Sequence, residues 1–198
     1  MIKKILIPLF LSFVLVSAAP LKIGEKAPDF ELKNALGETI SLSDYQGKIV
    51  VLESVNYNCP FVKKFYRPGK MQAWQKEYAE KGVVWLSVSS SAPNKSGYYE
   101  GKKLLKVIEQ NNTDPSLYLV DASGTVGRTY GAKTTPHFFI VNPQQELIYQ
   151  GAIDSIRSTS SKDIDKAENY VKLALNSALS GQPVATTETK AYGCGVKY

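Results

Sequence analysis

Cys59 is the residue of this 198-residue sequence that is best placed to do chemistry. It follows the β-branched run from Ile49 to Leu52, which is typical of a buried strand, and it precedes Pro60, which fits the first turn of a helix. A thiol at that junction lies near unpaired backbone N–H groups and the positive end of the helix dipole, which favours the thiolate. The position therefore predicts a nucleophilic cysteine, and the alternative is a small cysteine buried in the core.

Positively charged side chains follow Cys59 within two helical turns. Lys63, Lys64 and Arg67 each add positive potential near the sulfur. Because nearby positive charge lowers the pKa of a thiol, we expect Lys63 and Arg67 to help stabilise the thiolate.

The elements that must position Cys59 alternate between strands and helices. Residues 28–42 predict a β-hairpin with Gly37 in its turn, and Pro68-Gly69 must kink or interrupt the helix that starts at Pro60. Further strands are predicted over residues 48–55, 83–89, 117–120, 137–141 and 146–150, and helices over residues 60–81, 96–111, 124–130 and 161–179. This succession predicts an α/β fold with a mixed sheet, followed by a polar tail over residues 182–198 that has nothing to bury.

Composition excludes several classes of protein. Hydrophobic residues make up 43% and charged residues 21%, which are ordinary values for a globular domain and exclude a disordered or multi-span membrane chain. The net charge of +6 is mild and spread along the chain, so no nucleic-acid partner is expected. Two cysteines and one distant histidine do not make a standard zinc site, and we expect neither a metal nor an organic cofactor.

The first 18 residues have the pattern of a secretory signal peptide. Lys3 and Lys4 precede an apolar run over residues 5–16, and small residues follow up to a favoured cleavage site after Ala18. The run is shorter than the roughly 20 apolar residues that span a bilayer, so no membrane insertion is expected after cleavage. The sequence thus predicts a periplasmic or secreted protein, with a main domain over residues 19–181 and the tail over residues 182–198.

Three motifs give the sequence a resemblance to a known superfamily. They are the Cys-Pro-Phe stretch from Cys59, the stretch over residues 126–131, and Thr134-Thr135-Pro136, with residues 24–30 marking the start of the similarity. Together they resemble the thioredoxin superfamily, in particular its redoxin branch of peroxiredoxin-like proteins, of the alkyl hydroperoxide reductase and thiol-specific antioxidant type. The resemblance implies a thioredoxin-like fold, with a central mixed sheet flanked by helices and an N-terminal β-hairpin extension.

The resemblance also implies how a substrate would dock. Pro136 matches the superfamily's cis-proline, which lies against the reactive sulfur, here that of Cys59. A bend at Pro136 leaves the backbone of Thr135 free to pair with an extended substrate segment. The thiol chemistry requires that the Cys59 sulfur be open to solvent and next to Pro136.

The sequence departs from both branches that it resembles. Val62 stands where thioredoxins carry their second cysteine, so Cys59 lacks the usual short-loop partner. Peroxiredoxins carry a proline, a threonine and an arginine where this chain has Leu52, Asn56 and Pro136. Asn56 could still donate a hydrogen bond to the thiolate, and Arg128 or Arg67 could supply the cation. These departures favour thiol–disulfide exchange over peroxidase activity.

Cys194 is the second cysteine, flanked by glycines near the end of the tail. The flanking glycines would leave its sulfur accessible, and its natural role would be a resolving thiol that attacks a sulfenate or mixed disulfide at Cys59. A bond between the two would restrict the unfolded chain by about 5 kcal/mol in the chain-entropy model. The alternatives are a permanent structural disulfide, a disulfide between two chains, and a spare thiol.

Glu53 lies six residues before Cys59, at the spacing of the buried acid of thioredoxins. Buried there, it would have a raised pKa and could move the proton of the cysteine. The alternative is a carboxylate at the strand end paired with a lysine. His137, the single histidine, is expected to be a neutral strand residue.

The sequence as a whole predicts an exported thiol-dependent oxidoreductase, with Cys59 as nucleophile and Cys194 as resolving thiol. Its partners would be a thiol or disulfide protein, or a peroxide, and reducing equivalents would come from a partner thiol protein. Two alternatives stay open, a peroxiredoxin-like thiol peroxidase that uses the same cysteines and a non-catalytic binding module with the same fold. The direction of electron flow and the oligomeric state are left open by the sequence.

Overall fold

The computed structural model of the chain describes residues 21–198. The predicted signal peptide lies outside these residues. Within them, no helix combines the length and the apolar character needed to cross a bilayer.

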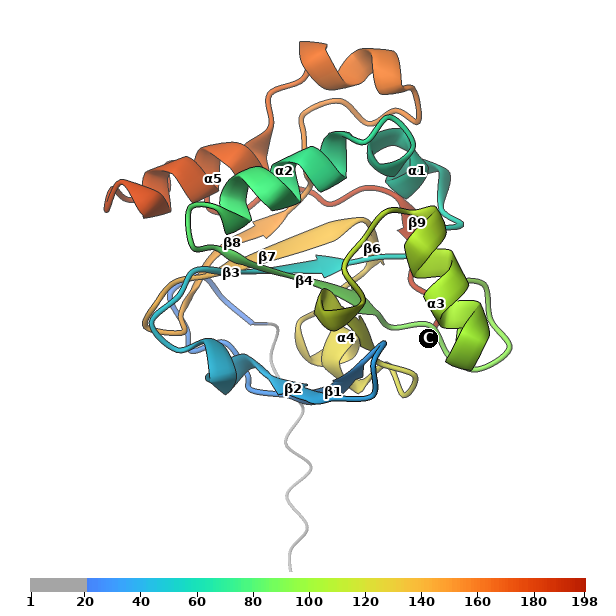
Figure 1. Cartoon of the computed structure of the whole chain (residues 1–198). Helices are drawn as coiled ribbons and strands as arrows, with labels where there is room; N and C mark the ends of the chain where they lie inside the picture. The colour runs from blue at the N-terminus through green and yellow to red at the C-terminus, as the bar shows by residue number, and fades with distance from the viewer. Residues whose placement is uncertain (1–20) are drawn as a thin grey trace, which may run out of the picture.

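A mixed sheet of seven strands forms the centre of the molecule (Figure 1). Its strands, in spatial order, are β2 (Thr39–Ser41), β1 (Glu31–Asn34), β5 (Tyr118–Val120), β4 (Val84–Ser89), β3 (Val50–Ser54), β7 (His137–Val141) and β8 (Leu147–Gly151). Strands β3, β4 and β5 run parallel, whereas the hairpin β1–β2 and the strands β7 and β8 pair antiparallel with their neighbours. The predicted mixed sheet and N-terminal hairpin are confirmed.

Helices cover both faces of this sheet, with α1, α2 and α5 along one face and α4 on the other (Figure 1). The α-helices are α1 (Pro60–Tyr66), α2 (Lys70–Ala79), α3 (Gly101–Gln110), α4 (Thr125–Thr129) and α5 (Tyr170–Leu179). Three 3₁₀ helices are η1 (Leu42–Tyr45), η2 (Pro115–Leu117) and η3 (Ser161–Lys166). This arrangement places the start of α1 beside the ends of the central strands.

The central strand β3 shows why both faces must be covered. Successive side chains of a strand point to opposite faces, so Val51 packs with α1, α2 and α5, while Val50 and Leu52 pack with α4 and the N-terminal segment. Every residue of β3 is buried, as expected for a β-branched run in the middle of a sheet. The strand therefore provides a rigid support for the loop that carries Cys59.

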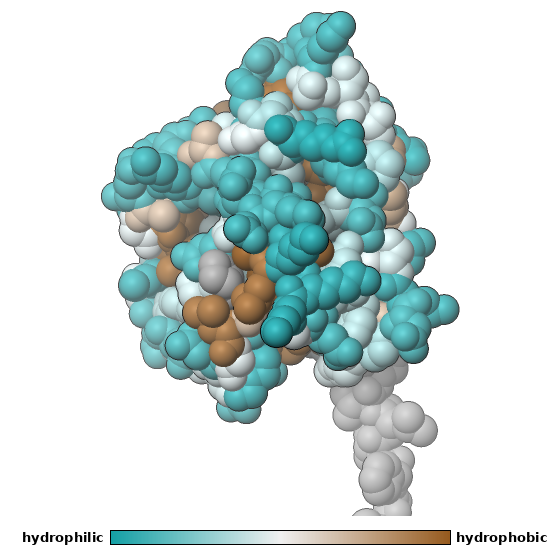
Figure 2. All heavy atoms as spheres, turned by 45° about the vertical axis from the view of Figure 1, so that its right-hand side comes forward, coloured by the Kyte–Doolittle hydropathy of each residue, from teal (hydrophilic) through white to brown (hydrophobic). Residues whose placement is uncertain are grey.

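The exposed surface is mostly hydrophilic on the face that Figure 2 shows, around a smaller group of hydrophobic side chains near its middle. The large hydrophobic side chains that are exposed within residues 21–198 are Leu36, Leu105, Leu173 and Leu179. Most of the apolar surface is thus buried in the two clusters on the faces of the sheet.

The helix predicted over residues 60–81 is interrupted at Pro68-Gly69, as the sequence predicted. It is divided into α1 and α2, because Gly69 between them has a left-handed φ of 75° and Pro68 cannot continue the first helix. Two other helices differ from the prediction. The helix predicted from residue 96 begins only at Gly101, and the one predicted over residues 161–179 is divided into η3 and α5.

The tail over residues 182–198 is folded against the domain, so the prediction that it has nothing to bury is wrong. The backbone of Thr187 and Thr189 hydrogen-bonds to Gln150 of β8. Tyr192 is buried, and Cys194–Gly195 forms a short strand, β9, that pairs antiparallel with β6 (Thr134–Thr135). The tail therefore runs from the edge strand β8 to the proline loop, and its last residue, Tyr198, lies against Arg128 of α4.

Candidate active site

The backbone around Cys59 fixes this residue at the junction of a loop and a helix. Cys59 is the N-cap of α1, and Pro60 takes the first helical position, as predicted. Its N–H donates to the carbonyl O of Asn56 at 2.9 Å, and its own carbonyl O accepts from the N–H of Lys63 at 2.9 Å. These two bonds hold the backbone of Cys59 at the start of α1.

The proline loop meets the Cys59 side chain directly. The peptide bond between Thr135 and Pro136 is cis, as the resemblance implied. The sulfur of Cys59 lies 3.0 Å from the carbonyl O of Thr135, to which the thiol donates. Cys59 and the cis-proline loop therefore form one site.

Cys194 completes this site from the tail. In the pairing of β6 with β9, Cys194 lies opposite Thr135, and its sulfur is 2.6 Å from that of Cys59, both residues being thiols. The two cysteines of one chain are therefore within reach of a disulfide bond without rearrangement of the tail.

The two thiols have opposite pKa shifts. Burial by itself raises the pKa of Cys59, but hydrogen bonds from the side chains of Cys194 and Thr135 and from the N–H of Val62 outweigh it, and the pKa is lowered. Burial and the neighbouring Cys59 raise the pKa of Cys194 to about 11. As the first proton leaves, the negative charge is therefore expected on Cys59, with Cys194 protonated and donating to it.

The exposure of Cys59 differs from the expectation. The residue is only 2% exposed, whereas the proposed chemistry requires a sulfur that is open to solvent. Cys59 is buried because the folded tail covers it. Strand β9 pairs with the proline loop, and the ring of Tyr192 packs edge-to-face on Phe61, two residues after Cys59. A reactant must therefore pass the tail or displace it.

Glu53 lies in β3 and is fully buried. Its Oε2 accepts from the hydroxyl of Tyr66 and the indole N–H of Trp85, each at 2.9 Å, so the alternative of a pairing with lysine is wrong. Burial, only partly offset by these hydrogen bonds, raises the pKa of Glu53 to about 7. A carboxyl that titrates near neutrality suits proton transfer, although the structure shows no hydrogen bond between Glu53 and either cysteine within residues 21–198; the proton-transfer role stays a prediction.

Four residues were predicted to stabilise the thiolate, and the structure places them differently. Lys63 is close enough to lower the pKa of Cys194 by its charge. The side-chain amide of Asn56 donates to the carbonyl O of Ser96 at 2.9 Å. Arg67 is exposed just after α1. For all of them, the effect on the thiolate stays a prediction.

Arg128 is the fourth of these residues. It donates to the carbonyl O of Ser123 at 2.8 Å and lies over the ring of Tyr198, 4.2 Å from its centroid. Arg128 thus contacts the last residue of the tail, and the structure shows no hydrogen bond from it to either sulfur among residues 21–198.

Sequence reasoning missed the residues that hold the tail in place. Lys64, counted there as one of several cations near Cys59, is buried and forms an ion pair with Asp154 at 2.8 Å. Tyr192 bonds to the same carboxylate. The one signal in the sequence was the presence of two aromatic residues, Tyr192 and Tyr198, on either side of Cys194 in an otherwise polar tail.

His137 is the neutral strand residue that was predicted. It is buried in β7, and burial lowers its pKa to about 4. It is therefore uncharged near neutrality.

Comparison with known proteins supports what the geometry indicates. Residues 23–150 match the AhpC/TSA family. The chain belongs to the AhpC/TSA family. One relative in this comparison is peroxiredoxin Bcp of Bacillus subtilis (strain 168), 36% identical over 107 residues. The match covers 51% of this chain and 58% of Bcp, so the chain spans less than two thirds of the length of that relative.

Solved structures agree with this AhpC/TSA assignment at the level of the fold. An uncharacterized conserved protein from Geobacillus kaustophilus superposes with a TM-score of 0.76 at 25% identity, covering 90% of this chain and 93% of that one. Peroxidoxin BcpB from Mycobacterium tuberculosis gives a TM-score of 0.55 at 22% identity, covering 81% and 97%. The predicted thioredoxin-like fold is confirmed.

Proposed function

We propose that this chain is an exported thiol oxidoreductase with two cysteines, in which Cys59 is the nucleophile and Cys194 the resolving thiol. The observation that supports it is the 2.6 Å separation of the two sulfurs. The opposite pKa shifts support these roles, because the thiol with the lowered pKa is the better first nucleophile and the protonated one would follow.

The favoured oxidant is a small hydroperoxide. The Cys59 thiol first loses its proton to solvent. The thiolate attacks the peroxide, the O–O bond breaks, and the sulfur becomes a sulfenic acid, while the leaving oxygen takes a proton from solvent and departs as an alcohol or water. The Cys194 thiol then attacks this sulfur; the S–S bond forms, and the hydroxyl leaves as water with the Cys194 proton. A partner dithiol reduces the disulfide and returns the two electrons.

The closed geometry of the site favours this small oxidant. An extended polypeptide would have to pair with Thr135 at the proline loop, and that edge is taken by Cys194 of the same chain. Cys59 itself is 2% exposed, so a bulky substrate would reach it only after the tail moves aside. Two of the similar proteins, Bcp and BcpB, are named as a peroxiredoxin and a peroxidoxin.

Thiol–disulfide exchange is the second candidate, and a specific observation favours it. Leu52, Asn56 and Pro136 stand where peroxiredoxins carry the residues that activate the peroxide, and the amide of Asn56 is already bound to Ser96. In this case Cys59 would attack a disulfide, a thiolate would leave, and Cys194 would release the second thiolate. The tail would have to leave the proline loop for each substrate to enter.

The proposed location follows from the N-terminal sequence. The cationic start, apolar run and small residues of positions 1–18 support export, and an exported protein meets an environment in which disulfides persist. The reductant would then be an exported or membrane-borne thiol protein.

A direct comparison of oxidants tests the proposal. The reduced wild-type protein is mixed in separate experiments with hydrogen peroxide and with a disulfide-linked peptide, and loss of the Cys59 thiol is followed by quenching and mass spectrometry. Faster oxidation by peroxide supports the peroxidase, and faster reaction with the peptide supports exchange. Cys59→Ser is the control in both experiments. If the wild-type protein reacts no faster with either oxidant than an unstructured cysteine peptide does, both enzymatic candidates are contradicted, and the non-catalytic binding module is the remaining interpretation.

A further inference from the structure

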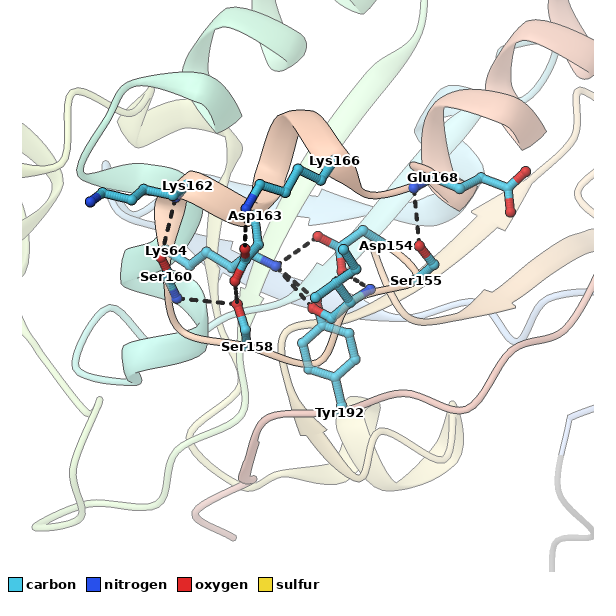
Figure 3. Close-up of polar contacts among 11 residues, drawn as sticks. Lys64, Asp154, Ser155, Ser158, Ser160, Lys162, Asp163, Lys166, Glu168 and Tyr192 are labelled. Carbon is cyan, nitrogen blue, oxygen red and sulfur yellow. Dashed lines mark hydrogen bonds and ion pairs between the residues drawn. The ribbon is translucent and has the colours of Figure 1, made fainter.

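A buried ion pair lies beneath the tail, and the reaction proposed above does not use it. The Lys64 ammonium is 2.8 Å from Oδ2 of Asp154, and the two side chains are 0% and 3% exposed (Figure 3). The ammonium also donates to the carbonyl O of Ile156 at 3.0 Å. Burying two charges carries a large desolvation penalty, so a pair of this kind calls for partners that satisfy the remaining donors and acceptors.

Tyr192 is the third member of this group and the one that belongs to the tail. Its hydroxyl donates to Oδ1 of Asp154 and lies 3.5 Å from the Lys64 ammonium. Figure 3 shows the three side chains pointing toward one another from α1, from the segment after β8 and from the tail. Tyr192 is 8% exposed, and its ring packs edge-to-face on Phe61, with centroids 5.7 Å apart. The tail is therefore docked through the Tyr192 side chain.

The path from Tyr192 to Cys194 leaves little freedom. Gly193, between them, has a φ of 151°, and a Cβ built on it would lie 2.1 Å from the carbonyl O of Thr135. The chain thus passes in direct contact with the proline loop. Because Cys194 is only two residues after Tyr192, anchoring the Tyr192 side chain restricts the positions that the Cys194 sulfur can reach.

The other side of Cys194 is held as well. The N–H of Val196 donates to the carbonyl O of Lys133, and the hydroxyl of Tyr198 donates to the carbonyl O of Ala132 at 2.8 Å. These bonds reach only main-chain carbonyls. The anchor at Tyr192 is the one that ends on a buried charge pair, where the loss of a hydrogen bond is most costly.

We infer that Lys64, Asp154 and Tyr192 form a latch that positions Cys194 over Cys59, with Tyr192 as a positioning residue for the resolving step. The inference rests on the proposed role of Cys194. The latch affects the two steps in opposite directions, because a docked tail shields Cys59 from an incoming reactant and presents Cys194 once Cys59 has reacted. A weaker latch accelerates the first step and slows the second.

An aromatic disulfide that releases a coloured thiolate separates the two steps. The Cys59 thiolate attacks the probe, the probe's S–S bond breaks, and one coloured thiolate leaves while a mixed disulfide remains on Cys59. Cys194 then attacks that mixed disulfide, loses its proton to solvent, and releases the second coloured thiolate as the bond between Cys59 and Cys194 forms. The first release reports access to Cys59, and the second reports resolution.

Tyr192→Phe is the decisive variant, since it keeps the ring and removes only the hydroxyl. A hydrogen bond to a buried charge corresponds to roughly a tenfold change in the docking equilibrium. In the mixed disulfide, the aromatic group on Cys59 occupies the place of Cys194, so only a minor fraction of the molecules has the tail docked. The rate of resolution is proportional to this docked fraction, which a weaker latch lowers further. We expect the first release to become about tenfold faster and the second about tenfold slower. Asp154→Asn should act in the same directions, but it leaves a buried ammonium unpaired and is the riskier variant for folding.

Tyr78→Phe is the matched control. The Tyr78 hydroxyl is also buried and bonded, to Asn176 at 2.9 Å, but it joins α2 to α5, and its hydrogen-bond partners, Asn176 and Lys172, lie in α5 and not in the tail. Wild-type rates in Tyr78→Phe together with opposite changes in Tyr192→Phe support the latch. Unchanged rates in Tyr192→Phe, or changes of the same sign in both variants, overturn it.

Cys194→Ser separates a failure of the latch from a failure of the proposed function. The second release must vanish in this variant if Cys194 resolves. Persistence of the second release contradicts the proposed function and the latch together. Its loss, combined with wild-type behaviour of Tyr192→Phe, overturns the latch alone.

Discussion

Cys194 and Cys59 stand 135 positions apart in the chain, and their sulfur atoms lie 2.6 Å apart. The contact depends on strand β9, which brings Cys194 opposite Thr135 at the proline loop. The proline loop and a second thiol are thus brought to Cys59 by two segments that meet in one small sheet.

Oxidation should stabilise the folded protein. A bond that closes the long loop between Cys59 and Cys194 restricts the unfolded chain, which corresponds to about 5 kcal/mol in the chain-entropy model. We expect the free energy of unfolding of the oxidised wild-type protein to exceed that of the reduced protein by up to this amount in urea titrations. Cys194→Ser should show no difference between oxidising and reducing conditions, and an equal difference in that variant would refute the assignment of the stabilisation to this bond.

The pKa of Cys59 should depend on the atom at position 194. The hydrogen bond with Cys194 lowers the pKa of Cys59, because the Cys194 thiol can donate to the Cys59 thiolate, so Cys194→Ala, which removes the donor, should raise the pKa of Cys59. Cys194→Ser keeps a donor and should raise it less. Thiolate absorbance as a function of pH measures both variants, and identical titration curves in the serine and alanine variants would show that the hydrogen bond has no effect.

Glu53 should make stability depend on pH. Because its pKa is raised from 4.5 to about 7 in the folded state, the carboxyl stabilises the fold below pH 4.5, and this contribution is lost as the pH rises through about 7. The free energy of unfolding of Glu53→Gln relative to the wild type should therefore increase by about 3 kcal/mol over that range. Taking the difference between variants removes the opposite contribution of His137, whose pKa is lowered to about 4.

Urea unfolding at a series of pH values measures this difference. Glu80→Gln, at an exposed position after α2, is the matched control and should follow the wild type. A Glu53→Gln curve parallel to that of the wild type would mean that Glu53 does not titrate in this range.

Substitution by alanine should have very different effects at the two glycines that flank Cys194. Gly193→Ala places a methyl group against the carbonyl O of Thr135 and holds a side chain at a φ of 151°, so it should displace the tail. A Cβ at Gly195 meets nothing within 4 Å. We expect formation of the bond between Cys59 and Cys194 to slow at least tenfold in Gly193→Ala and to stay near the wild-type rate in Gly195→Ala, measured by quenched alkylation. Equal rates in the two variants would contradict the close approach.

The sequence was informative wherever the signal is local. Three local features each predict the backbone conformation at their own position: the β-branched run of β3, Pro60 at the first turn of α1, and the Thr135-Pro136 pair. The first two together predict that Cys59 lies at the junction between a strand and a helix. The seven-stranded sheet follows from the alternation of such segments.

The tail could not be predicted in this way, because what folds it is a set of contacts between distant residues. A lysine in a helix, such as Lys64, is normally expected at the protein surface. Its burial is made favourable by the carboxylate of Asp154 and the hydroxyl of Tyr192, which lie far along the chain. The tail is a short polar segment with little periodicity, and its own sequence does not indicate which distant residues it will contact. For the same reason the burial of Cys59 beneath the tail was missed.

Peptide mapping of the oxidised protein without reduction tests the central claim most directly. The protein is treated with one equivalent of oxidant, digested, and analysed by mass spectrometry alongside an intact-mass measurement. The account predicts a monomeric chain that has lost two hydrogen atoms, with the peptide of Cys59 linked to the peptide of Cys194. Both thiols recovered free, or a link found only between two chains, would contradict it.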